Sequence, residues 1–155
     1  MQPYGGFWIR FVAYIIDAII LQIVATVLGL FVGVGIGAAG AGEDAVAAST
    51  LIAVGLSLVI NWLYYAILES SEWQGTVGKK ALSLVVTDES GERLGFGRAT
   101  GRYFAKFLSS FILAFGFFMI GWTQRKQGLH DMIAGTLVHK TNSPDLIRSS
   151  AAVFE

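Results

Sequence analysis

Two ionisable side chains interrupt the first apolar run of the chain, residues 5–24, at Arg10 and Asp17. On an α-helix seven residues span two turns and about 10 Å, so both project from nearly one face, with Tyr14 between them. A carboxylate about two turns inside a bilayer costs on the order of 2.5–3.5 kcal/mol, so Asp17 needs a protein partner, a wet cavity or a proton. Arg10 is the nearest cation in the sequence. Such a pair indicates either an ion or proton pathway or a structural ion pair between helices.

The composition indicates that lipid is the solvent for much of the surface. Of the 155 residues, 54% are hydrophobic and only 14% are charged, which is unusual for a soluble domain of this size. The 11 basic and 11 acidic side chains give a net charge of zero, which argues against a nucleic-acid-binding protein that neutralises phosphates. The chain has no cysteine, so it can form neither a disulfide nor a thiolate metal site.

Two long apolar runs, charge-free over residues 18–42 and 45–68, predict membrane-spanning helices at about 9–37 and about 47–68. Each is long enough for the roughly 20 residues that a hydrocarbon core requires. The loop between them contains no lysine or arginine. Small residues recur at every fourth position of the first helix and predict a helix-packing face for which the second helix is the expected partner. These residues are Ala25, Gly29, Gly33 and Gly37.

The polar segment 69–102 is expected on the cytoplasmic side. The alternation in "ALSLVV" predicts a short strand, and "DESGE" predicts a turn, which together indicate a hairpin-like element. Arg98, Arg102 and Lys106 follow at i, i+4 and i+8 beside several aromatic residues, as in an interfacial amphipathic helix. This basic stripe either faces anionic lipid headgroups or is an ordinary positively charged cytoplasmic flank.

The topology depends on a third hydrophobic segment, residues 103–122, which precedes the segment 123–140 and a polar tail, 141–155. The distribution of lysine and arginine places the N-terminus, the 69–102 segment and the end of the chain in the cytoplasm. A single crossing by 103–122 would put the basic residues that follow it outside, whereas a bent or re-entrant hairpin would return them. We favour the hairpin. In that arrangement residues 135–140, "GTLVHK", can pair with "ALSLVV".

Arg10, Asp17, the segment "TVGKKALSLVVTDESGERLGFGRATGRYFAKFLS" and "QGLHDMIAGTLV" together resemble the RDD family of bacterial membrane proteins, named for one arginine and two aspartates. The resemblance covers about residues 4–140. It implies a functional polar cluster of Arg10, Asp17 and Asp131; Tyr14, and His130 beside Asp131, are candidate contributors. Three central positions also match, namely Thr76, Gly78 and Lys79, with Val77 where many members have proline. If Asp131 meets Arg10, both lie at one membrane face, since a crossing would separate them by roughly 30 Å.

The sequence therefore predicts an all-α, multi-pass protein of the bacterial inner membrane, a single membrane domain over residues 1–140. Our first hypothesis, which follows from the resemblance, is that the polar cluster contributes to transport of a cation, proton or small solute. The alternative is a non-transporting accessory or assembly subunit of a larger membrane complex. Both predict a homo-oligomer or a complex, because three hydrophobic segments enclose little space. We expect no metal, no cofactor and no enzymatic activity: two histidines nine residues apart are not a zinc motif, and no catalytic constellation is evident.

Overall fold

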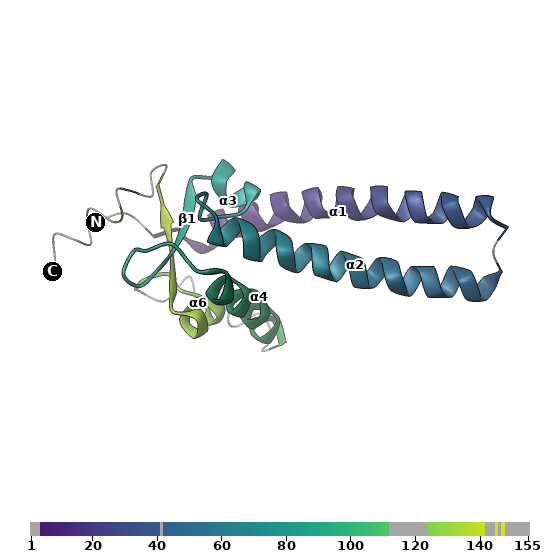
Figure 1. Cartoon of the computed structure of the whole chain (residues 1–155). Coiled ribbons are helices and arrows are strands. Elements are labelled where there is room, and N and C mark those ends of the chain that lie inside the picture. The colour runs from purple at the N-terminus through teal and green to yellow at the C-terminus, as the bar shows by residue number, and fades with distance from the viewer. Residues whose placement is uncertain (1–3, 41, 112–123, 142–144, 146, 148–155) are drawn as a thin grey trace.

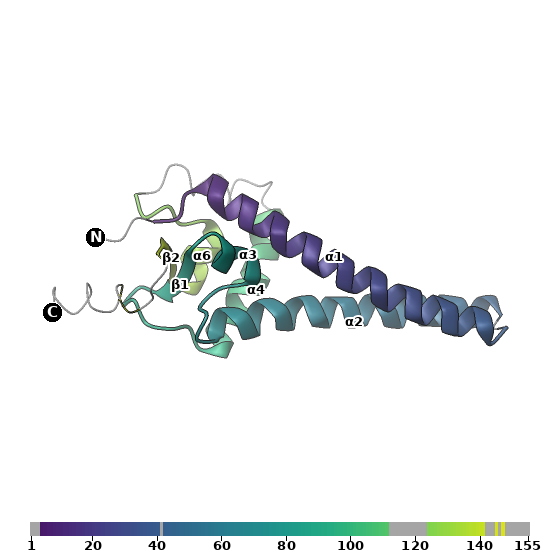
Figure 2. The same cartoon turned by 90° about the horizontal axis from the view of Figure 1, so that it is seen from above.

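The computed structural model describes residues 4–40, 42–111, 124–141, 145 and 147. Two long helices extend side by side from one end of the molecule (Figure 1), and the shorter helices, the strands and the chain ends lie at the other. The long helices are α1 (Phe7–Ala38) and α2 (Glu43–Ser70). They splay apart from the turn that joins them toward the end that carries the sheet (Figure 2). We refer to that end as the polar head.

Both long helices are sufficiently long and apolar to cross a membrane. The most apolar 18-residue window of α1 has a mean hydropathy of 2.5 with none of it buried, and that of α2 has 2.0 with 11% buried. Helices of this length and hydropathy that bury almost nothing within their own chain require an apolar environment. The sequence-based prediction of two such helices is therefore confirmed, although each extends beyond its predicted bounds.

Within the described residues, the polar head contains three shorter helices and one two-stranded sheet. The helices are α3 (Val77–Ala81), α4 (Phe96–Phe111) and α6 (Leu129–Ala134), and the strands are β1 (Leu84–Asp88) and β2 (Thr136–Lys140). The strands pair antiparallel, with Val86 opposite Val138. A small apolar core of Ala13, Leu84, Val86, Leu94 and Val138 fixes the sheet against the start of α1.

The strand pairing confirms one prediction and corrects another. "ALSLVV" and "GTLVHK" do contribute β1 and β2. The hairpin-like element is wrong, however, because β1 pairs with a strand about 50 residues further on and not with its sequence neighbour. The predicted turn after β1 is present: the Asp88 carboxylate accepts hydrogen bonds from the backbone N–H groups of Ser90 (3.0 Å) and Glu92 (2.8 Å). Asp88 thus closes the turn locally, without a second strand.

Two glycines permit specific backbone arrangements in the polar head. Gly135 ends α6 in the left-handed conformation, with φ 58°, which turns the chain directly into β2. Gly78 in α3 packs on the backbone of α1, where a Cβ would lie 2.2 Å from the carbonyl oxygen of Ala13. Only a residue without a side chain allows this close approach of α3 to α1.

The third hydrophobic segment is described only in part. α4 extends to Phe111, whereas residues 112–122, and most of the tail 141–155, lie outside the described residues. α4 and α6, on either side of that gap, pack against each other in the polar head.

Candidate functional site

Six charged residues of the polar head form one largely buried cluster that joins five helices. Its carboxylates are Glu69, at the end of α2, and Asp131, in α6, with 1% and 0% of their surfaces exposed. Its basic members are Arg10 from α1, Lys79 from α3, and Arg102 and Lys106 from α4. We call these six residues the ion-pair cluster.

Asp131 receives a guanidinium group on each carboxylate oxygen. Arg102 donates from Nε (3.0 Å) and Nη2 (2.6 Å) to Oδ1, and Arg10 donates from Nη1 to Oδ2 at 2.5 Å. Oδ2 also accepts from the backbone N–H of Gly128 at 3.1 Å, which caps the first turn of α6. Burial alone would raise the pKa of Asp131, but the surrounding charges, that of Arg102 first, together with the hydrogen bonds from Arg102, outweigh it and hold the pKa well below its usual range.

Glu69 is the second centre of the ion-pair cluster. Arg102 Nη1 donates to its Oε2 at 2.7 Å, so this one guanidinium bridges α2 and α6. Lys79 donates to Oε1 of Glu69, and Lys106 Nζ lies 3.6 Å from the same oxygen. Removing one member of such a buried network leaves the others without compensation, which is typically strongly destabilising.

Arg10 has three separate partners. Besides Asp131, its Nε donates to the carbonyl of Gly5 and its Nη2 to that of Lys126, both at 2.7 Å. The arginine therefore ties the beginning of α1 to the segment that precedes α6. Arg10 and Asp131 lie at the same end of the molecule, and the structure brings them into direct contact.

Asp17 lies in a second, distinct polar site and does not contact Arg10. Its Oδ1 accepts hydrogen bonds from the Tyr64 hydroxyl and the Gly78 backbone N–H, both at 2.7 Å, and its Oδ2 accepts from the Thr76 hydroxyl at 2.5 Å. Asp17 is fully buried. Its partner is thus the N-terminal turn of α3, whose free N–H groups and dipole favour a carboxylate. The expectation that Arg10 is the partner of Asp17 is therefore wrong, since Arg10 pairs with Asp131.

The two candidate contributors lie in different places. Tyr14 is 57% exposed and lines a cleft between α1 and α2. His130 is buried, with Nε2 at 3.4 Å from Asp131 Oδ1. Burial lowers the pKa of His130 to about 3, so the imidazole is neutral near pH 7.

Of the three residues in the predicted basic stripe, two reach the surface and one is buried. Arg98 is on the surface and pairs with Asp88 at 3.0 Å, and the Lys106 side chain is 21% exposed. The prediction that Arg102 faces lipid headgroups is wrong. Only 1% of its surface is exposed, and both carboxylates of the ion-pair cluster bind it. The exposed face of α4 is instead apolar, formed by Phe96, Phe104, Phe107 and Leu108.

The predicted small-residue face is not a contact between α1 and α2. A Cβ added at Gly29, Gly33 or Gly37 would meet nothing within 4 Å, so these glycines are open within the described part of the chain. The expectation that α2 packs on them is wrong, because no atom of α2 lies within 4 Å of these Cβ positions. Ala25 is half-buried and lines the cleft.

Sequence reasoning missed Glu69, which binds three of the four basic side chains of the ion-pair cluster. The available signal was its position: Glu69 is the first charged residue after the apolar run of α2. Sequence reasoning also missed Tyr64, which donates to Asp17. Among the described residues no group of three or more His, Cys, Asp or Glu side chains is arranged to hold a metal ion.

Two long apolar helices joined to a compact polar head by buried ion pairs define a small membrane protein, and comparison with known proteins identifies its family. The chain belongs to the RDD family, whose family model matches residues 4–135. It is 42% identical over 150 residues to the uncharacterized protein YxaI of Bacillus subtilis (strain 168), an alignment that covers 89% of this chain and 98% of that protein. No solved structure matches the chain.

Proposed function

We propose that this protein is a non-transporting accessory or assembly subunit of a larger complex in the bacterial inner membrane, and that the ion-pair cluster is its structural clamp. The observation that carries the proposal is that every carboxylate oxygen of Asp17, Glu69 and Asp131 already has a donor or a cation from the chain itself. A passing cation would have to displace arginine or lysine from buried Glu69 and Asp131, and hydroxyl and N–H donors from buried Asp17. Such a site is suited to holding helices in position and not to ion exchange.

The proposal places the polar head in the cytoplasm. The head contains most of the lysine and arginine residues, whereas the turn between α1 and α2 contains Glu43 and Asp44 and no basic residue. The positive-inside rule therefore supports a cytoplasmic N-terminus and a periplasmic α1–α2 turn. The contact between Arg10 and Asp131 supports a hairpin path for residues 103–122, since α4 and α6 both belong to the head.

The open face of α1 supplies the docking surface in this proposal. Gly29, Gly33 and Gly37 recur at every fourth position and have nothing within 4 Å in the described chain. Small residues at this spacing allow a second membrane helix to approach closely, and packing is what drives association in lipid. A rigid head with an unpartnered membrane helix is what an assembly subunit requires.

Transport of a cation, proton or small solute is the second candidate, and one observation favours it. A cleft between α1 and α2 is lined by polar side chains within the membrane-spanning part, including Gln22, Ser57 and Asn61. Polar groups at membrane depth commonly mark a translocation pathway. Asp17, one residue before the cleft-lining Ala18, would be the residue of interest in that pathway.

Reconstitution and native electrophoresis distinguish the two functions. In proteoliposomes the purified protein should give no proton or cation flux above empty vesicles, and Asp17→Asn should not alter this. In mild detergent extracts of the native host, the protein should migrate as a complex larger than its dimer. Gly33→Leu should disrupt that complex, whereas the matched control Gly55→Leu, at a glycine of α2 that is equally open, should not. Flux that Asp17→Asn abolishes in a folded protein would support transport and overturn the accessory role.

A further inference from the structure

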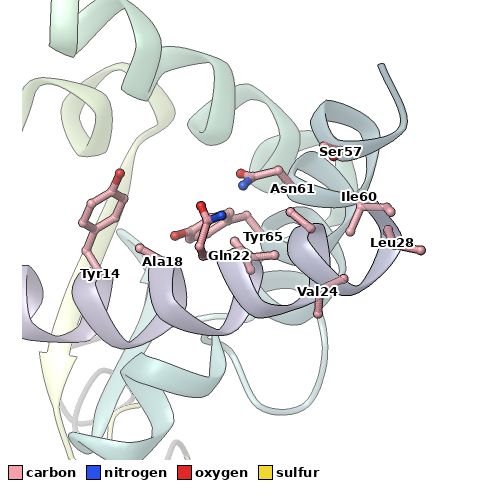
Figure 3. Close-up of a pocket in the computed structure, with 11 residues that line it drawn as sticks. Tyr14, Ala18, Gln22, Val24, Leu28, Ser57, Ile60, Asn61 and Tyr65 are labelled. Atoms are coloured by element: carbon pink, nitrogen blue, oxygen red, sulfur yellow. The ribbon is translucent and has the colours of Figure 1, made fainter. Parts of the chain in front are cut away.

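The cleft between α1 and α2 is lined by more polar side chains near the polar head than further from it, where Ser57 lies among apolar residues (Figure 3). It has a volume of about 260 Å³. Tyr14 and Asn61 lie toward the polar head, and Figure 3 shows both side chains, with that of Gln22, pointing into the space between the helices. Further from the head the α1 wall consists of Val24, Ala25 and Leu28. A ligand that matches this lining must itself be amphipathic.

A positively charged group lies beside the polar end of the cleft. Lys106 Nζ is 4.0 Å from the centroid of the Tyr65 ring, and Tyr65 lines the cleft. The Tyr103 hydroxyl donates to Asn61 Oδ1 at 3.2 Å, so α4 closes this end of the cleft. Ammonium and phenol hydroxyl groups are both suitable donors to phosphate oxygens.

The ion-pair cluster behind Lys106 carries an excess of basic side chains. Arg10, Lys79, Arg102 and Lys106 face only two carboxylates, those of Glu69 and Asp131. Asp17 adds a third negative charge nearby, since its hydrogen-bond donors are neutral groups, so the basic side chains exceed the carboxylates by one. An anion near Lys106 would therefore experience a net attractive field in a site screened little by water.

We propose that this cleft binds one phospholipid with an anionic headgroup. The headgroup phosphate lies beside Lys106 and the tyrosine hydroxyls, and an acyl chain follows the apolar wall toward Leu28. From Tyr14 to Leu28 the helix rises by about 21 Å, at about 1.5 Å per residue, which is comparable with the depth of one bilayer leaflet. The lipid fills a space between two membrane helices that the chain itself leaves open, and it offsets the basic excess of the polar head.

Native mass spectrometry of delipidated protein tests the proposal. The protein is returned to detergent micelles containing phosphatidylglycerol or phosphatidylcholine, and the retained lipid is counted. We expect one phosphatidylglycerol per chain and at least a tenfold lower retention of phosphatidylcholine. Lys106→Ala should reduce this preference at least threefold. The matched control is Lys80→Ala, because Lys80 also lies over an aromatic ring, that of Trp73 at 4.7 Å, but is not beside the cleft.

A second variant tests the apolar part of the cleft without altering the charge. Ala18→Leu should fill the space and reduce retention of both lipids, whereas Ala47→Leu, on an exposed part of α2, should leave it unchanged. Thermal unfolding of each variant in lipid-free micelles verifies that it is folded. Equal retention of the two lipids by the wild type, unchanged retention in Ala18→Leu, or a preference that Lys106→Ala leaves intact would overturn the proposal. Displacement of the lipid by millimolar inorganic phosphate would also overturn it, since that result describes a site for a free anion.

Discussion

Gly78→Ala tests the contact between α3 and α1 that holds Asp17 in place. A Cβ at this position would lie 2.2 Å from the Ala13 carbonyl oxygen and 3.0 Å from Asp17 Cγ. The first of these atoms is backbone and cannot rotate away, so α3 must shift. Overpacking of this kind costs about 1–3 kcal/mol. The shift also breaks the hydrogen bond from the Gly78 N–H to the Asp17 carboxylate (2.7 Å), which contributes about 1.5–3 kcal/mol as a bond to a charged group.

The expected loss is therefore about 3–6 kcal/mol, a large part of the about 5–15 kcal/mol that stabilises a typical folded protein. Chemical denaturation in detergent micelles, followed by tryptophan fluorescence, measures it. Gly101→Ala is the matched control: Gly101 is also helical, and an added Cβ there meets nothing within 4 Å. It should be neutral or stabilising by up to about 1 kcal/mol. A Gly78→Ala protein as stable as the wild type would refute the close packing of α3 on α1.

Three further predictions concern single side chains. Glu69→Gln should destabilise the protein by about 3–5 kcal/mol because it removes the negative charge that three basic side chains share. Glu89→Gln, at a side chain 62% exposed, should change the free energy of unfolding by less than about 0.5 kcal/mol. Thr76→Val removes a donor to Asp17 and the cap of α3 and should cost about 1–3 kcal/mol, most of which Thr76→Ser restores. Burial lowers the pKa of His130 to about 3 in the folded protein, whereas in the unfolded chain a histidine has a pKa of about 6.5. Between these two values only the unfolded chain binds the proton, so the free energy of unfolding should fall by about 2 kcal/mol from pH 7 to pH 5. His130→Gln should reduce this dependence on pH. Chemical denaturation curves measure the stability of all these variants, and for His130→Gln they are recorded at both pH values. An unchanged pH dependence of stability in His130→Gln would contradict the assignment of a buried neutral imidazole.

Hydropathy was sufficient to predict α1 and α2. A charge-free apolar run long enough to span a bilayer has few alternatives, because the lipid imposes a length and a composition. The pairing of β1 with β2 could be proposed only on the condition that residues 103–122 form a hairpin. The alternation of side chains indicates a strand but does not specify its partner.

The directions of charged side chains could not be predicted from local sequence. Arg98, Arg102 and Lys106 lie four residues apart and form one stripe, yet Arg102 is buried because Glu69 and Asp131, from α2 and α6, meet at its position. Similarly, Asp17 was assigned to the nearest cation in sequence, Arg10. Its actual donors come from α2 and α3, about 50–60 residues away. Burial of a charge is a tertiary property, and only the packing of all five helices that contribute to the cluster determines it.

The central claim is that the ion-pair cluster clamps α1 to α6 through Arg10 and Asp131. A double-mutant cycle of Arg10→Gln and Asp131→Asn, measured as free energies of unfolding in micelles, tests it most directly. The 2.5 Å contact between the two buried side chains predicts a coupling energy above about 1 kcal/mol, in the range found for residues in one ion-pair network. Additivity of the two substitutions within about 0.3–0.5 kcal/mol would show that the residues act independently and would contradict the clamp.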